Sequence, residues 1–416
     1  MRFPRLTIPT PPTWADRIAT VGVTGTNGKS TTTTWLAAAL RRLGGPVVRI
    51  TTLGFYVDDD ELALPKDYDG FVEAMRVGLE RGARHAAIEL TSEALGRGFA
   101  RAWPCRVGVF TNLTHDHLDA HGTPEHYLAS KAQLFVSLPP GGTAVLNGCD
   151  PSSELLAEIV PKGARARTYG VASRGHPVLP LDACATEIAA TWAGTRVTGT
   201  IDGAPLDLTT AGLGAIYAEN ALAALLGAEA MGVPREAAIE ALAAAPPPRG
   251  RFDVVSERPH VVVDYAHSPD ALARTLEAAR ALLDADGRGG ALWVVFGAGG
   301  ARDREKRGPM GAAARVADHV VLTNDNPRDE RPESIVAQIL EGLGDHPSAR
   351  VELERHLAIR HAVQCAAPND AVLLCGMGHE GTQTIGGVRR AFSDREVALA
   401  ALAERLDRGT REPRED

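Results

Sequence analysis

Cysteine is scarce in this sequence, and the few cysteines lie far apart. The 416 residues include five of them, Cys105, Cys149, Cys184, Cys365 and Cys375, and no two form the CxxC spacing of a zinc or redox motif. An odd number of scattered thiols is also a poor framework for disulfides. We therefore expect free, buried thiols in a chain that works in a reducing cytoplasm.

Long apolar runs and an excess of positive charge are also missing. No uninterrupted apolar stretch is long enough to cross a membrane, and the N-terminus lacks the apolar centre of a signal peptide. The formal net charge is −8, whereas a surface that coats nucleic acid is normally basic. We therefore expect neither a membrane nor a nucleic acid as a partner. The oligomeric state stays open.

The remaining composition is that of an ordinary globular protein, with 44% hydrophobic and 23% charged residues, long enough for two or three domains. Short β-branched runs alternate with Ala- and Leu-rich stretches, which is typical of an α/β fold with mostly parallel sheets covered by helices. Between about residues 179 and 208, a Thr-rich alternation indicates a small β insertion. Strands are expected at 47–51, 86–90, 107–111, 144–147, 261–264, 292–296, 319–323 and 371–375.

A change of composition indicates where the chain divides. Helices are expected at 218–231 and near 235–244, and Ala245-Pro-Pro-Pro-Arg-Gly250 follows them. Consecutive prolines cannot continue a helix and favour a stiff, extended connector. We therefore expect two domains, residues 1–247 and 248–416.

The most informative motif is a glycine-rich turn near the start of the chain. A β-branched run stops at Gly25-Thr26-Asn27-Gly28-Lys29-Ser30, and threonines from Thr31 onward lead into an apolar helical stretch. Glycines let the backbone N–H groups face an anion, and the start of a helix adds positive dipole. Lys29 would then reach the β- and γ-phosphates, and Ser30 or Thr31 a Mg²⁺ ion. The turn predicts nucleoside triphosphate binding, although Val23 replaces the first glycine of the usual motif.

Two further segments carry candidates for metal binding. Glu89 ends an apolar strand, the position where open α/β sheets bind ligands. It is a candidate Mg²⁺ ligand, and equally a surface glutamate at a strand end. After the next strand, the block from Phe110 to Phe135 contains several histidines and aspartates, His117 among them. Thr123 and Pro124 then form a good helix start.

This helix places Lys131 among apolar neighbours such as Tyr127 and Leu134. Apolar surroundings favour the neutral amine of a lysine. A neutral amine can take up CO₂ and become a carbamate, which supplies a carboxylate for a metal. The alternative is a lysine whose stem covers apolar surface while its amine stays in water, with the histidines in a polar loop.

Together with later motifs, these segments resemble the Mur ligase family, which forms amide bonds with ATP in peptidoglycan synthesis. The likeness covers about Thr20 to Leu406 and is greatest to the branch that adds diaminopimelate to UDP-N-acetylmuramoyl-dipeptide. It implies a P-loop ATPase domain with a mostly parallel sheet, followed by a Rossmann-like α/β domain. The motifs are Gly25–Ser30, Phe110–Phe135, Gly250–Phe252, Val263–Asp270, Phe296–Asp303 with Lys306 and Arg307, Asp325–Arg328, Gly376–Glu380 and Phe392–Glu396.

The resemblance also implies a reaction and its residues. A carboxylate is phosphorylated by ATP, and an amine attacks the resulting acyl phosphate in a site that excludes water. The implied catalytic and Mg²⁺-binding residues are Lys29, Ser30, Glu89, His117 and Lys131 as its carbamate. The ATP site adds Gly25, Thr26, Asn27, Gly28, Thr31, Asn220, Arg251, Asp264 and His267. The amino-acid site comprises Asp325, Asn326, Arg328, Gly376 and Glu380, with Arg328 on a carboxylate and Glu380 on a distal ammonium.

The sequence departs from the family mainly on the acceptor side. About fifteen residues precede the strand of the glycine-rich turn, where the family carries a domain that grips UDP. Thr91-Ser92-Glu93 stands in place of Ser-Ser-His, the substrate loop is not found near residues 62–68, and Met377 replaces a lysine. Because the ATP and metal motifs are nearly complete, our first hypothesis is a ligase whose acceptor differs from complete UDP-muramoyl-dipeptide.

Three alternatives stay open. The chain is a true tripeptide synthetase whose UDP-binding domain is lost or supplied by another chain, or it is a nucleotide-binding regulator that does not catalyse. The intact set of catalytic residues argues against the regulator. A folylpolyglutamate synthetase fits the blocks 325–328 and 376–380 poorly. For Ser393–Glu396 the sequence favours a capping box with a purely structural role.

Overall fold

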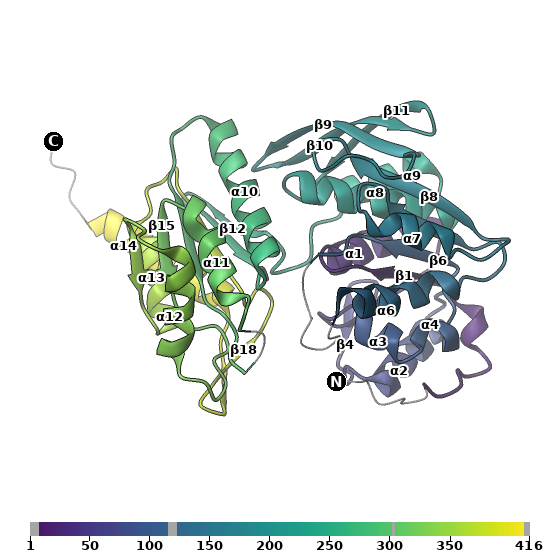
Figure 1. Cartoon of the computed structure of the whole chain (residues 1–416), viewed down its shortest axis with the longest axis horizontal. Coiled ribbons are helices and arrows are strands. Elements are labelled where there is room, and N and C mark those ends of the chain that lie inside the picture. Colours follow the sequence, from purple (N-terminus) through teal and green to yellow (C-terminus); the bar gives the residue numbers. More distant parts are fainter. Residues whose placement is uncertain (1–7, 115–122, 302–303, 412–416) are drawn as a thin grey trace. The chain divides into compact units, whose positions relative to one another are not determined.

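The computed structural model of the chain describes residues 8–114, 123–301 and 304–411 (Figure 1). The chain divides into two compact units, Met1–Pro247 and Pro248–Asp416. The division falls inside the proline-rich connector that follows helix α9 (Arg235–Ala244). In the part of the chain that the structure describes, no helix is both long and apolar enough to span a bilayer.

The first unit is built on one large sheet in the order β11-β10-β9-β8-β7-β6-β1-β5-β2-β3-β4. Its middle, from β9 to β2, is parallel, and antiparallel strands extend both edges. The expected β insertion is confirmed as the antiparallel strands β9 to β11. The strands are β1 (Ala19–Thr24), β2 (Val47–Ile50), β3 (Phe55–Val57), β4 (Asp60–Leu62), β5 (His85–Glu89), β6 (Val107–Phe110), β7 (Thr143–Asn147), β8 (Arg165–Val171), β9 (Ala183–Thr191), β10 (Gly194–Ile201) and β11 (Ala204–Thr210).

Helices cover both faces of this sheet. Helices α1, α8 and α9 pack together, and α8 lies against β6 to β9, so its almost wholly apolar sequence is buried on nearly every side. Helix α6 begins as predicted, because the Thr123 hydroxyl accepts from the His126 N–H and Pro124 is the first helical residue. The helices are α1 (Lys29–Leu40), α2 (Tyr68–Glu80), α3 (Ser92–Gly96), α4 (Phe99–Ala102), α6 (Pro124–Val136), α7 (Ser152–Glu158), α8 (Ala215–Ala230) and α9, with 3₁₀ turns η1 (Ala15–Arg17) and η2 (Arg41–Leu43).

The second unit is a doubly wound sheet in the order β12-β13-β17-β14-β15-β16, parallel except for β12. Helix α11 packs with both α10 and α12, and α13 packs with α14 (Figure 1). A separate hairpin, β18–β19, precedes α14. The elements are β12 (Asp253–Glu257), β13 (His260–Asp264), α10 (Pro269–Asp286), β14 (Leu292–Phe296), α11 (Arg307–Ala313), η3 (Ala314–Val316), β15 (His319–Leu322), α12 (Pro332–Leu343), β16 (Ala349–Val351), α13 (Arg355–Cys365), β17 (Ala371–Cys375), β18 (Thr382–Ile385), β19 (Val388–Ala391) and α14 (Asp394–Arg411).

The predicted α/β class is confirmed in both units. Each of the eight strands that were given bounds from the sequence is present, with ends within one residue of the expectation. The buried β-branched runs are what parallel strands covered on both faces require. Because parallel strands end at the same edge, the polar residues after β1, β5 and β6 gather in the first unit, and those after β13, β14, β15 and β17 gather in the second.

Candidate active site

The glycine-rich turn joins β1 to α1, and its shape depends on two glycines. Gly25 has φ +149°, and a Cβ there would lie 1.9 Å from the Thr111 hydroxyl oxygen. Gly28 has φ +85°, and a Cβ there would lie 2.2 Å from Oδ1 of Asn220. Both positions therefore need the absence of a side chain as well as the left-handed backbone.

The loop after β6 holds this turn in place. The Thr26 N–H donates to the Asn112 carbonyl (2.8 Å), and the Asn27 N–H donates to the Asn112 side chain (2.9 Å). The Thr111 hydroxyl donates to the Asn27 carbonyl (2.6 Å). These contacts fix the turn, which leads into the first turn of α1 with Lys29, Ser30 and Thr31, where the helix dipole favours an anion.

Glu89 lies against this turn and is not a surface glutamate at a strand end. Its Oε2 accepts from the Ser30 hydroxyl (2.8 Å) and from the Thr52 N–H (3.1 Å), and both Ser30 and Glu89 are buried. A carboxylate and a hydroxyl beside a phosphate-binding turn are oxygen donors of the kind that Mg²⁺ prefers. The pair therefore fits a Mg²⁺ site. Among the described residues no group of three or more His, Cys, Asp or Glu side chains is arranged so that it could hold a metal ion, and His117 lies outside these residues.

Lys131 of α6 is buried against the same turn. Its side chain is 1% exposed, its amine donates to the Gly25 carbonyl (2.6 Å), and it lies 4.2 Å from the centroid of the Tyr127 ring. Burial excludes the alternative of a lysine whose amine reaches water. Lys131 and the Ser30–Glu89 pair therefore lie at the two ends of one turn. Carbamylation stays a prediction.

Asn220, on α8, lies behind the turn. Its side chain is buried, and Oδ1 accepts from the Thr32 hydroxyl of α1 (3.4 Å) as well as lying against Gly28. This contact fixes the start of α1 relative to α8. The role of Asn220 beside adenine stays a prediction.

In the second unit, the carboxylate of Asp264 is hydrogen-bonded to the backbone. It accepts from the N–H groups of Phe252 (2.6 Å) and Ala266 (2.8 Å), and Phe252 has φ +48°. Burial raises the pKa of Asp264, while the charge of Arg251 acts in the opposite direction. Asp264 therefore holds the segment that carries Arg251, and its expected contact with nucleotide stays a prediction.

Tyr265 stands at the centre of an aromatic and basic cluster. The Arg251 guanidinium lies 4.5 Å from its ring centroid, and the His267 and His379 rings lie 4.5 and 5.1 Å away. The Lys306 amine donates to the His267 carbonyl (2.8 Å). Three predicted segments, 250–252, 263–270 and 376–380, therefore meet around one tyrosine.

The predicted amino-acid residues come together at the ends of β15 and β17. The Asn326 amide donates to Oε2 of Glu380 (2.8 Å), and a Cβ on Gly376 would lie 2.4 Å from Oδ2 of Asp325. Arg328 has φ +54°, and its guanidinium donates to the Gly300 carbonyl (2.5 Å). Burial and the charge of Asp325 raise the pKa of Glu380. The arrangement places a cation and a carboxylate on one loop cluster, which suits an amino acid with charges of both signs.

Some contributors to this cluster were missed from the sequence. The Tyr265 hydroxyl donates to Oε1 of Glu380 (3.4 Å), and the Gln383 amide donates to the Asp325 carbonyl (2.6 Å). Arg307, which the sequence identified only as a motif residue, is fully buried and forms an ion pair with Glu330 (2.8 Å). Tyr265 lies inside a recognised motif and could have been found there, whereas the hairpin residue Gln383 carries no signal of its own.

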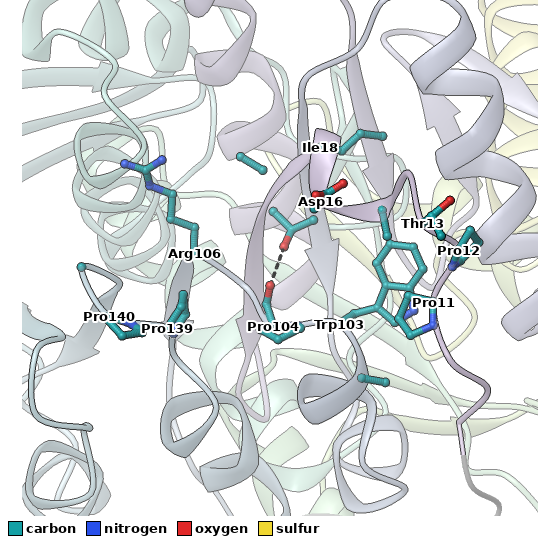
Figure 2. Close-up of a pocket in the computed structure, with 15 residues that line it drawn as sticks. Pro11, Pro12, Thr13, Asp16, Ile18, Trp103, Pro104, Arg106, Pro139 and Pro140 are labelled. Carbon is teal, nitrogen blue, oxygen red and sulfur yellow. Dashed lines mark hydrogen bonds between the residues drawn. The ribbon is translucent and has the colours of Figure 1, made fainter.

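A separate pocket of about 690 Å³ lies at the opposite end of β1 from the glycine-rich turn (Figure 2). Trp103, Arg106 and several prolines line it, and the Thr20 hydroxyl donates to the Pro104 carbonyl there (3.4 Å). None of the predicted site residues lines it. This pocket therefore does not coincide with the candidate active site.

Two family models match this chain. The Mur ligase middle domain matches residues 23–228, and the Mur ligase glutamate ligase domain matches residues 250–378. A UDP-N-acetylmuramoyl-L-alanyl-D-glutamate--2,6-diaminopimelate ligase of Thermosynechococcus vestitus is 40% identical over 94% of this chain and 78% of its own length. The enzyme of the same name from Ralstonia nicotianae is 39% identical over 94% of this chain and 77% of its own length.

This chain is also similar to solved structures. A structure of a ligase with that name is 30% identical, with a TM-score of 0.65 over 94% of this chain and 79% of the other. The folylpolyglutamate synthase of Mycobacterium tuberculosis has a TM-score of 0.71 over 94% of this chain and 91% of the other, at 17% identity. The latter likeness concerns the fold alone.

Proposed function

This chain belongs to the Mur ligase family of ATP-dependent amide-bond-forming ligases, and from that premise we propose that it joins an acceptor carboxylate to a diaminopimelate-like amino acid. Its cofactors are ATP and Mg²⁺. The contact that carries the proposal for the amino acid is the hydrogen bond between Asn326 and Glu380. It brings the loop of Arg328 to a carboxylate 54 residues away in sequence.

The first unit supports the phosphoryl-transfer half of the reaction. When a carboxylate attacks the γ-phosphorus of ATP, several negative charges come together, and Mg²⁺ offsets part of that repulsion. Lys29 and the first N–H groups of α1 would hold the phosphates. Ser30, Glu89, His117 and the carbamate of Lys131 would hold the metal, and the contact between Ser30 and Glu89 at this turn supports the first two.

The second unit supports the choice of amine. A forked guanidinium such as that of Arg328 recognises a carboxylate, and Glu380 suits an ammonium at the far end of the same molecule. Asn326 and Tyr265 both donate to Glu380, which fixes the orientation of its two oxygens. An amino acid with a second amine and a second carboxylate satisfies both groups.

The acceptor is proposed to differ from complete UDP-muramoyl-dipeptide. In place of the family's Ser-Ser-His, Thr91 caps α3 by accepting from the Ala94 N–H (3.2 Å), and Glu93 pairs with Arg97 (2.6 Å). A carboxylate thus replaces an imidazole close after Glu89 in the sequence. This change supports an acceptor with different groups at that end.

UDP-N-acetylmuramoyl-L-alanyl-D-glutamate itself is the second candidate. Relatives that are 36–40% identical to this chain carry that acceptor in their names. Under this alternative, Glu93 is a surface substitution without effect on the acceptor. A regulator that binds nucleotide without catalysis is the third outcome that an assay must separate.

The test is a matrix of ADP-release assays in which the acceptor and the amine vary independently. Diaminopimelate is compared with lysine, alanine and glutamate, and UDP-muramoyl-dipeptide is compared with free dipeptides and simple acids. We expect diaminopimelate to be the preferred amine with an acceptor other than the UDP-dipeptide. Rapid turnover of the UDP-dipeptide supports the second candidate. ATP binding without amine-dependent ADP release in any combination would contradict a ligase.

A further inference from the structure

The segment Ser393–Glu396 does more than begin a helix. The Ser393 hydroxyl accepts from the Glu396 N–H (3.4 Å), so the predicted cap is present. Asp394, inside that cap, is fully buried and faces Arg355 of α13, which is also fully buried. Arg355 donates from Nε to Oδ1 of Asp394 (2.7 Å) and from Nη2 to Oδ2 (2.6 Å). A cap alone does not require a buried, two-point ion pair.

The other donors of Arg355 reach two backbone carbonyls. Nη1 donates to the Asn324 carbonyl (3.2 Å), and Nη2 donates to the Cys375 carbonyl (2.9 Å). Asn324 directly precedes Asp325, and Cys375 directly precedes Gly376. The guanidinium therefore contacts the last residue before each loop of the proposed amino-acid site.

The sheet by itself does not tie these two loops together. In the order β17-β14-β15, strand β14 lies between the strands that carry them, so β15 and β17 share no ladder hydrogen bonds. Beyond the strand ends, the Asn326–Glu380 contact joins the loops through side chains. At the strand ends, Arg355 links the Asn324 and Cys375 carbonyls through a rigid, planar group whose donors have fixed directions.

Resting on the proposed function, we infer that Arg355 is a positioning residue that sets the spacing of the Asp325–Arg328 and Gly376–Glu380 loops, with Asp394 holding its guanidinium in the required plane. The carboxylate of Asp394 is well placed for this role, because it lies at the start of α14, where the helix dipole favours negative charge. Neither residue touches the amino acid. Their effect is on the distance between the groups that do.

The test uses the full chain and three variants. Arg355→Met removes both carbonyl contacts and leaves Asp394 unpaired. The double variant Arg355→Met/Asp394→Leu removes both charges, which restores an apolar interior without restoring the contacts. Arg355→Lys keeps the charge and loses the fork. The control is Arg405→Met, since Arg405 also donates to carbonyls of the α13–α14 layer, those of Val363 and Ala366, near the other end of α14.

Three readouts are taken: thermal unfolding, amide hydrogen exchange at 325–330 and 376–381, and steady-state kinetics with meso-diaminopimelate. Because a misplacement of about 1 Å can cost roughly 100-fold, we expect kcat/KM for diaminopimelate to fall roughly 10- to 100-fold in the double variant. The KM for ATP should stay within about twofold. Exchange in both loops should rise in Arg355→Met and in the double variant, and Arg355→Lys should fall between these variants and the wild type.

Two results would overturn the inference. One is a double variant whose loop exchange and kcat/KM are those of the wild type, since the pair would then serve only local folding. The other is an equal loss in Arg405→Met. If the wild-type chain accepts no diaminopimelate with any acceptor, the proposed function fails, and loop exchange alone then decides the positioning role.

Discussion

Replacing Gly28 by alanine should weaken ATP binding for two reasons, a steric clash and a strained backbone. The structure allows the free-energy cost of each to be estimated separately. The new Cβ would lie 2.2 Å from Oδ1 of Asn220, whose side chain is buried and holds the Thr32 hydroxyl. The backbone at Gly28 also has φ +85°, a left-handed conformation that costs an alanine roughly 1–2 kcal/mol. Moving Asn220 away from Thr32 costs about 1 kcal/mol more. The sum is about 2–3 kcal/mol.

If the whole sum is lost from the binding free energy of ATP, the affinity for ATP falls by roughly 30- to 150-fold. Calorimetric titration with ATP and Mg²⁺ measures the affinity, and thermal unfolding measures the part that appears as lost stability. Gly44→Ala is the matched control, because Gly44 has φ +86° and a Cβ there meets no atom within 4 Å. The double variant Gly28→Ala/Asn220→Ala removes the clash and keeps the strain. Wild-type affinity and stability in Gly28→Ala, or losses no greater than those in Gly44→Ala, would refute the reasoning.

Four other predictions concern single charges. Lys29→Ala should abolish ADP formation with a nearly unchanged unfolding temperature, because it removes a charge from the phosphates and one hydrogen bond to the Thr26 carbonyl (2.7 Å) but no core packing; near-normal turnover would contradict the ATP assignment. Lys131 in a crystal with nucleotide and Mg²⁺ should carry three extra heavy atoms on its amine, and Lys131→Ala should regain activity with added acetate; a plain ammonium would count against the carbamate. Arg328→Lys should raise the KM for diaminopimelate at least tenfold, since a point charge cannot replace a fork; an unchanged KM would remove Arg328 from the site. Because the pKa of Glu380 is raised, its ionised form is lost at a pH above the ordinary 4.5 as the solution is acidified, so kcat/KM for diaminopimelate should fall there, and Glu380→Gln should abolish that pH dependence.

The strands could be predicted from sequence because a strand buried in a parallel sheet reads as a short β-branched run, and that signal is local. Val261–Asp264 and Ala371–Cys375 were identified in this way without knowledge that they are neighbours. The glycine-rich turn and the start of α6 were likewise identified from a few adjacent residues, since turn and capping chemistry depends on local backbone geometry.

Contacts between segments that are far apart in the sequence could not be predicted from such local signals. From the sequence, Glu89 was equally a Mg²⁺ ligand or a surface residue at a strand end. Only the 2.8 Å contact with Ser30, 59 residues earlier, places it against the turn. The sequence interpretation of Ser393–Glu396 as a cap was correct but incomplete, because the partner of Asp394 lies on another helix, 39 residues away.

The sequence by itself determined the fold class, the family and the glycine-rich turn, and it named the loops proposed to bind the amino acid, because each of these is recorded in short runs of neighbouring residues. The tertiary structure decided which of those residues meet. Asn220 lies against Gly28, Asn326 orients Glu380, and Arg355 joins two loops whose strands are separated by β14. The physical reason is that the order of strands in a parallel sheet differs from their order in the chain, so the residues gathered at its edge are set by the crossovers and not by distance along the sequence.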